Sequence, residues 1–188
     1  MNISPEEAQE ALAVIQQTSD RIRKGHGYNG YYLMIWGVVW FVGFMVNQFL
    51  QSNLAVVGWT WGGLVLAAFV GCTVLGVNQG KYVRSQMGPR TGFFYFALIV
   101  FTALWYILLM PQNTKQGVVF FISIIMFGGV IVGILNRTLS TVIGSVSVTI
   151  LALAGYYLLP AYFYLWEAIF GGLAMFVIGL VLRFWRWR

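Results

Sequence analysis

The sequence predicts an all-α protein, a polytopic membrane helix bundle of six transmembrane helices preceded by a cytoplasmic amphipathic helix. The 188 residues are 60% hydrophobic and only 9% charged, with a mean hydropathy of +0.79. Soluble domains have a charged fraction nearer ~25%. Six apolar stretches each approach the ~20 residues that a helix needs to cross hydrocarbon, where a helix satisfies its own backbone polar groups. They are residues 31–50, 54–77, 93–110, 117–135, 139–159 and 162–182.

The basic residues predict how the chain is threaded. Ten of the eleven Lys and Arg residues precede the first stretch, follow the sixth, or lie in the second and fourth connections. Only Lys115 lies in one of the alternate connections. By the positive-inside rule, we expect both termini on the cytoplasmic side of a bacterial inner membrane. The net charge of +6 is explained by this topology, so we expect a lipid bilayer and no nucleic acid as the partner.

The chain is predicted to have two units. Residues 1–30 form a cytoplasmic amphipathic helix with a linker, and residues 31–188 form the six-helix transmembrane domain. A Ser-x-x-Glu capping box with proline at the first helical position begins the N-terminal helix at Pro5. Gly25 and Gly27 are expected to end it.

An apolar seam runs along this N-terminal helix at alternating spacings of four and three residues. Its members are Ala8, Leu12, Ile15, Ser19 and Ile22. Such a narrow seam is typical of a helix that packs against a partner. Residues 5–24 are therefore expected to dock on the protein's own loops, to lie on the inner leaflet, or to bind a second copy or another membrane or cytoplasmic protein.

Two pairs of glycines at four-residue spacing indicate where helices approach closely. Gly58 and Gly62 lie in the second stretch, and Gly129 and Gly133 lie in the fourth. Both are G-x-x-x-G patterns, which allow close van der Waals packing inside one chain or between copies.

Three hydroxyl residues, Thr141, Ser145 and Thr149, lie on one stripe of the fifth stretch. Hydroxyls at this spacing can bond back to carbonyl groups of their own helix. They can also form the polar lining of an interface or of a solute path, as in an oligomeric channel. The sequence leaves these interpretations open.

Glu167 is the only acidic residue after Asp20, and it lies inside the sixth stretch. A carboxylate is costly in hydrocarbon, so it usually faces a partner, water or a substrate. One interpretation places Glu167 at the outer rim, among the headgroups. The other makes it a counterion or proton site inside a cavity.

Aromatic residues surround this acid in the expected topology, and most of them fit an aromatic belt at the interface. Aromatic faces around one buried carboxylate are also what a site for an organic cation needs. Candidate ligand-binding residues beside Glu167 are Trp166, Tyr164, Trp40, Trp59 and Trp61. Trp40 is expected near the middle of the bilayer, where its indole N–H requires an acceptor.

The sequence contains no recognisable enzymatic machinery. His26 is the only histidine and Cys72 the only cysteine, so one chain cannot build a metal site from several histidines or thiolates. No nucleophile with a histidine base and no phosphate-binding glycine loop is present. We therefore predict no catalytic residues, no metal and no cofactor.

The SPEEAQEAL helix start followed by six aromatic-rich spans resembles small bacterial inner-membrane proteins that carry no assigned activity. In length and number of spans, the chain is also similar to the substrate-binding components of vitamin importers of the energy-coupling-factor type. That family typically has an A-x-x-x-A pattern in its first span. This sequence has Trp36, Gly37, Trp40 and Gly43 there, so the similarity is one of size.

The leading hypothesis from the sequence is a transporter or solute-binding membrane subunit for a small cationic or amphipathic compound. The alternatives are a non-transporting interaction or regulatory protein that acts through its N-terminal helix, and an oligomeric channel.

Overall fold

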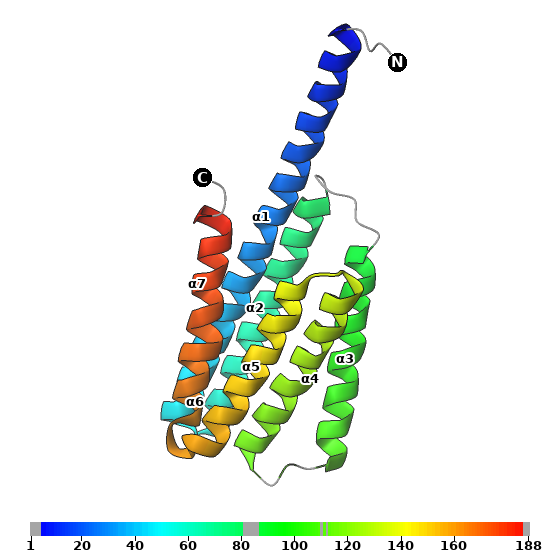
Figure 1. The fold of residues 1–188 in the computed structure, drawn as a ribbon. Coiled ribbons are helices and arrows are strands. Elements are labelled where there is room, and N and C mark those ends of the chain that lie inside the picture. Colours follow the sequence, from blue (N-terminus) through cyan, green and yellow to red (C-terminus); the bar gives the residue numbers. More distant parts are fainter. Residues whose placement is uncertain (1–4, 81–86, 110, 112, 186–188) are drawn as a thin grey trace.

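The computed structural model describes residues 5–80, 87–109, 111 and 113–185, and all regular secondary structure in these residues is helical (Figure 1). Six segments are long and apolar enough to cross a membrane, which confirms the predicted fold class. They are Gly30–Leu50, Leu54–Gly80, Arg90–Leu109, Thr114–Leu135, Leu139–Leu158 and Pro160–Phe184. The chain is therefore a multi-pass α-helical membrane protein.

Five of these spans belong to single α-helices, whereas the sixth is a run of short helical segments. The single helices are α1 (Pro5–Leu50), α2 (Leu54–Gly80), α3 (Met87–Leu109), α4 (Thr114–Leu135) and α5 (Leu139–Leu158). The sixth span, which we call span six, comprises the 3₁₀ turn η1 (Pro160–Tyr162), α6 (Phe163–Trp166), the π-helix η2 (Glu167–Leu173), α7 (Ala174–Leu180) and the π-helix η3 (Val181–Trp185).

The helix α1 continues without interruption from its N-terminal part into the first span, so the expectation that Gly25 and Gly27 end it is wrong. A glycine costs a helix only about 1 kcal/mol relative to alanine. The membrane span that follows must be helical, and it extends the helix across both glycines. The N-terminal part projects beyond the bundle (Figure 1), and Leu12 on the predicted seam is 57% exposed.

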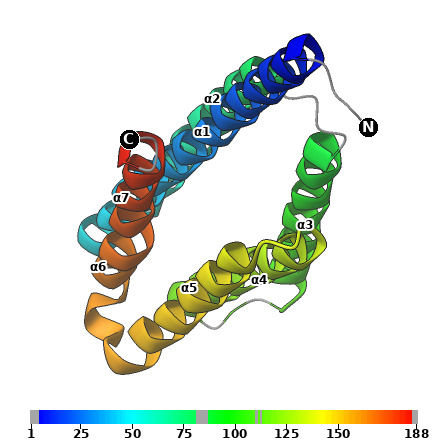
Figure 2. The same ribbon diagram turned by 45° about the horizontal axis from the view of Figure 1, so that its top comes forward.

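The spans form two groups, which Figure 2 shows as two rows that meet at one corner. In the first group, α1 packs against α2 and along most of span six. In the second group, α4 packs against α3 and α5. The groups join where α5 leads into span six, at the end of the bundle opposite both termini, which we call the distal end (Figure 1).

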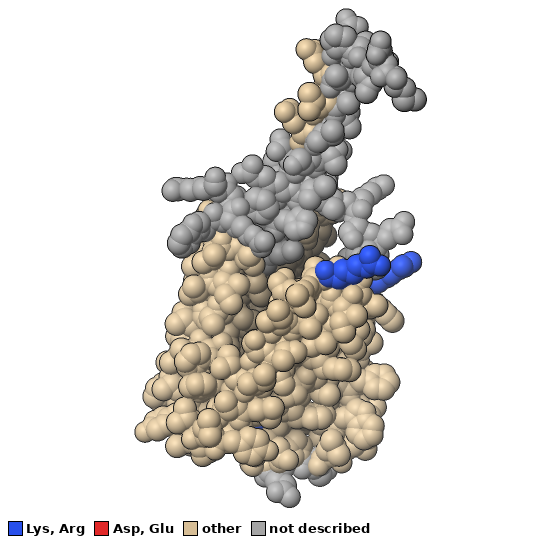
Figure 3. Space-filling model, in the orientation of Figure 1, with Lys and Arg blue, Asp and Glu red and all other residues tan. Residues whose placement is uncertain are grey.

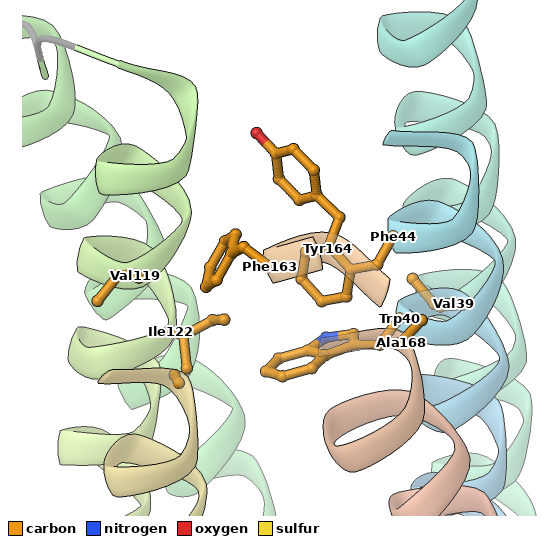
Figure 4. Close-up of a cluster of buried hydrophobic side chains, with 10 residues drawn as sticks. Val39, Trp40, Phe44, Val119, Ile122, Phe163, Tyr164 and Ala168 are labelled. Atoms are coloured by element: carbon orange, nitrogen blue, oxygen red, sulfur yellow. The ribbon is translucent and has the colours of Figure 1, made fainter. Parts of the chain in front are cut away.

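A core of buried side chains holds the two groups together near the distal end. Figure 4 shows Phe163 between side chains of α4, which include Ile122, and the α1 side chains Trp40 and Phe44. Phe163 is 0% exposed and Ile122 is 1% exposed. The first turn of span six is therefore the element that both groups share.

Glycines allow α1 and span six to cross at backbone contact. A Cβ atom on Gly37 would lie 2.6 Å from the backbone nitrogen of Phe176 and 2.8 Å from the carbonyl oxygen of Gly172. Gly30 and Gly179 meet in the same way, because a Cβ on either would lie 2.6 Å from the other's carbonyl oxygen. This contact was not predicted from the sequence. Its glycines are seven residues apart on each helix, Gly30 and Gly37 on α1 and Gly172 and Gly179 on span six.

The two G-x-x-x-G pairs that were predicted to pack helices closely differ in their surroundings. Gly129 lies against Ser145 of α5, and Gly133 would place a Cβ 2.7 Å from Val142, so this pair does pack helices closely. Around Gly58 and Gly62, no atom lies within 4 Å of such a Cβ. Gly58 and Gly62 therefore make no close packing contact in the described part of the chain.

On the face that Figure 3 shows, the described part of the bundle's body is almost uncharged. On the face in Figure 3, the basic side chains of the described residues gather at the end near the termini, and no acidic side chain is visible. This distribution agrees with apolar helices in a lipid bilayer.

Candidate functional site

Glu167 lies inside the protein rather than at its rim. Its side chain is only 2% exposed, and its Oε1 atom has no hydrogen-bond partner in the part of the chain that the structure describes. The structure therefore encloses this acid within span six, seven residues after that span begins at Pro160.

The backbone around Glu167 departs from a regular α-helix. Glu167 is the first residue of the π-helix η2, and its backbone N–H donates to the carbonyl groups of Phe163 and Tyr164. A π-helix has a wider turn than an α-helix, and such segments occur frequently at functional sites. The irregular backbone and the buried carboxyl group thus coincide.

Trp40 of α1 and Glu167 both lie next to Gly171, one turn along η2. A Cβ atom on Gly171 would lie 2.9 Å from Cε3 of Trp40 and 3.4 Å from Oε2 of Glu167. Glycine at this position thus leaves room for the indole ring next to the carboxyl group.

Trp61 belongs to the same aromatic cluster, but Trp59 does not. The rings of Trp40 and Phe44 are 5.6 Å apart, and those of Phe44 and Trp61 are 5.2 Å apart, both edge to face. The Trp61 indole N–H donates to Oδ1 of buried Asn47 at 3.0 Å, which fixes the ring against α1. Trp59 is 82% exposed, so its ring lies on the outside of the bundle.

Tyr164 and Trp166 precede Glu167 in the sequence and have different surroundings. The Trp166 indole N–H donates to the carbonyl oxygen of Leu151 at 2.9 Å, and its ring covers Gly155 of α5. Trp166 therefore attaches span six to α5. Tyr164 is 4% exposed and lies one helical turn closer to the distal end than Glu167.

The hydroxyl stripe of α5 does not form one continuous surface. Ser145 is 8% exposed and packs against Gly129, while the Thr149 hydroxyl donates to the carbonyl oxygen of Ser145 at 3.1 Å. Thr141 is exposed. Thr149 thus shows the backward hydrogen bond to its own helix, and Ser145 contributes to the contact between α4 and α5.

Two polar side chains at the distal end form hydrogen bonds that were not foreseen from the sequence. Gln48 at the end of α1 donates to the carbonyl oxygen of Ala161 at 3.2 Å and accepts from the Leu165 N–H at 3.3 Å. The Lys115 ammonium donates to the carbonyl oxygen of Pro160 at 2.6 Å. Both contacts fix the start of span six. The isolated positions of Gln48 and Lys115 in the sequence were the only signal, and neither one identifies its partner.

A cleft of about 610 Å³ opens at the distal end, where three connections meet. Its walls come from Gln51 after α1, residues 113–115 at the start of α4, and residues around η1 that include Tyr164. Glu167 is not among the lining residues, so the cleft and the buried carboxyl group are separate features.

Among the described residues, no three His, Cys, Asp or Glu side chains gather to hold a metal ion. No protein-family model, curated protein or solved structure shows significant similarity to the chain. Any function assigned to the chain therefore rests on the geometry of the site itself.

Proposed function

We propose that the protein binds and transports a small cationic or amphipathic organic compound, with Glu167 as its counterion or proton site. The supporting observation is a carboxyl group that is 2% exposed inside a membrane span and has one oxygen without a hydrogen-bond partner in the described residues. The proposed role is binding and transport rather than catalysis.

The energy of the buried acid supports this role. An ionised group without a partner in a low-dielectric interior costs several kcal/mol, and a buried unsatisfied acceptor alone costs about 1–3 kcal/mol. A cation or a proton that reaches Glu167 removes this cost. Acids inside membrane spans are for this reason typical of substrate and ion pathways.

The aromatic neighbour favours an organic cation over a metal ion. Trp40 and Glu167 both lie next to Gly171, and an indole face attracts an organic cation by about 2 kcal/mol or more where water is excluded. Phe44 and Trp61 extend this apolar surface from Trp40. A ligand with a positive nitrogen and an apolar body matches the combination.

We further propose that both termini lie on the cytoplasmic side of a bacterial inner membrane. The basis is the positive-inside rule, because ten of eleven basic residues fall on the side of the termini. Glu167 then lies in the outer half of the membrane, closer to the distal end.

A ligand screen on the purified full chain in detergent tests the proposed function. We expect benzyltrimethylammonium to stabilise the protein against thermal unfolding, by about 2.7 kcal/mol at a concentration of 100 times its dissociation constant. Neopentylbenzene, which has nearly the same shape and no charge, should give little stabilisation. Equal stabilisation by both compounds, or none by any organic cation in a broader series, would rule out the proposed site.

The second candidate is an interaction or regulatory protein that acts through residues 5–24. The observation that favours it is the projecting N-terminal part of α1, on which Leu12 is 57% exposed. This part of α1 extends past the bundle, so a partner protein that packs against the predicted seam would stabilise it.

Deletion of residues 1–24 separates the two candidates. If the protein transports a cation, we expect the deletion to leave ligand-induced stabilisation and uptake into liposomes within about twofold, because Glu167 is buried at the other end of the bundle. Loss of a co-purifying partner on deletion, from a protein that no organic cation stabilises, would instead support the interaction protein.

A further inference from the structure

The distal cleft has the charge of a site for an oxyanion. Among the described residues that line it, Lys115 is the only charged one and none is acidic. We propose that this cleft binds the phosphate head group of a membrane lipid. The proposal does not depend on the organic-cation site, because Glu167 does not line the cleft.

Lys115 is held in a position suited to a phosphate. Its ammonium donates to the carbonyl oxygen of Pro160 at 2.6 Å, a contact between two different connections of the chain. An ammonium group has three N–H donors, so two remain for a ligand. Hydrogen bonds between an ammonium and a phosphate oxygen are charge-assisted and roughly twice as strong as neutral ones.

The other polar groups of the cleft are suited to accompany that contact. Tyr156, Tyr157 and Tyr164 are among the lining residues, and each carries a phenolic hydroxyl that can donate a hydrogen bond. The side-chain oxygen of Asn113 already accepts the Gln116 N–H at 2.7 Å, so its amide NH₂ is the part that can donate. The lining residues thus offer several donor groups beside a volume of about 610 Å³, which is large enough for a glycerophosphate group.

The location favours a lipid over a soluble ion. The cleft lies at the distal ends of the spans, where tyrosine side chains typically lie at the level of the lipid head groups. Tyr157 is 74% exposed and the adjacent Leu158 is 76% exposed. These side chains on α5 offer an apolar surface beside the cleft, along which the acyl chains of a lipid can lie.

The test uses three probes: dioctanoyl phosphatidylglycerol, dioctanoylglycerol with the same chains and no phosphate, and free glycerol phosphate. Each is titrated into the full-length protein in a neutral detergent, and binding is followed by native mass spectrometry and thermal stabilisation. We expect the phosphatidylglycerol to bind, dioctanoylglycerol to bind at least about tenfold more weakly, and glycerol phosphate to bind more weakly than the lipid.

Lys115→Gln is the decisive variant, and Arg90→Gln is the matched control. Both remove one positive charge, and Arg90 is an exposed residue near the other end of the bundle. Lys115→Gln should weaken binding of the phospholipid about tenfold or more, whereas Arg90→Gln should change it less than about twofold. If Lys115→Gln fails to fold, Tyr157→Phe serves instead, with an expected weakening of about twofold to fivefold.

Three results would overturn the proposal. The first is equal weakening by Lys115→Gln and Arg90→Gln, or no weakening by Tyr157→Phe where that variant decides. The second is equally tight binding of dioctanoylglycerol. The third is glycerol phosphate that binds as tightly as the phospholipid, which would identify the ligand as a soluble phosphate ester.

Discussion

Replacing Glu167 with glutamine is expected to abolish binding of organic cations and their uptake into liposomes. The substitution keeps the size of the side chain and removes its charge. Removing one partner of a buried charge pair typically costs about 2–5 kcal/mol, which corresponds to at least about 30-fold weaker binding. Titration of benzyltrimethylammonium against the thermal stability of the variant measures this loss.

The same variant should be at least as stable as the natural protein when no ligand is present. The Oε1 atom of Glu167 has no hydrogen-bond partner in the described residues, so the amide gives up no hydrogen bond at that atom and no longer buries a charge. The control is Glu10→Gln, which makes the same change in net charge in the N-terminal part of α1 and should leave binding unchanged. Full cation binding by Glu167→Gln would refute the role assigned to this residue.

Replacing Gly37 with alanine is expected to destabilise the bundle by about 1–3 kcal/mol. The new Cβ would lie 2.6 Å from the Phe176 backbone nitrogen and 2.8 Å from the Gly172 carbonyl oxygen. Because these are backbone atoms, the contact can be relieved only by moving α1 away from span six. Unfolding by titration with sodium dodecyl sulfate, followed by circular dichroism, measures the change.

Gly62→Ala is the matched control for this experiment. Gly62 also lies inside a membrane-spanning helix, but no atom lies within 4 Å of its added Cβ. Alanine is the better helix former, so this variant should be unchanged or more stable by up to about 1 kcal/mol. Equal stabilities of the two variants would show that α1 and span six do not meet at Gly37.

The spans could be predicted from the sequence because hydropathy is a local property. Each apolar stretch is long enough to cross the membrane on its own, so the helix count does not depend on tertiary contacts. The predicted end of the N-terminal helix is the exception. Gly25 and Gly27 are local stop signals, yet the neighbouring span extends the helix through both of them.

The site could be predicted only in part, because helix packing is not local. A carboxylate inside an apolar stretch identifies Glu167 from its own position. Trp59 and Trp61 are both tryptophans of the second stretch, but one is 82% exposed and the other bonds to Asn47. Which face of α2 meets α1 is decided by contacts between spans, and these contacts leave no pattern in a single sequence.

A structure of the complex with a bound organic cation is the most direct test of the central claim that Glu167 is the counterion of the ligand. The account predicts that the positive nitrogen lies within about 4 Å of a Glu167 carboxylate oxygen, with the Trp40 ring in contact with the same group. A cation bound elsewhere in the protein, with the Glu167 carboxyl group out of contact, would contradict the account.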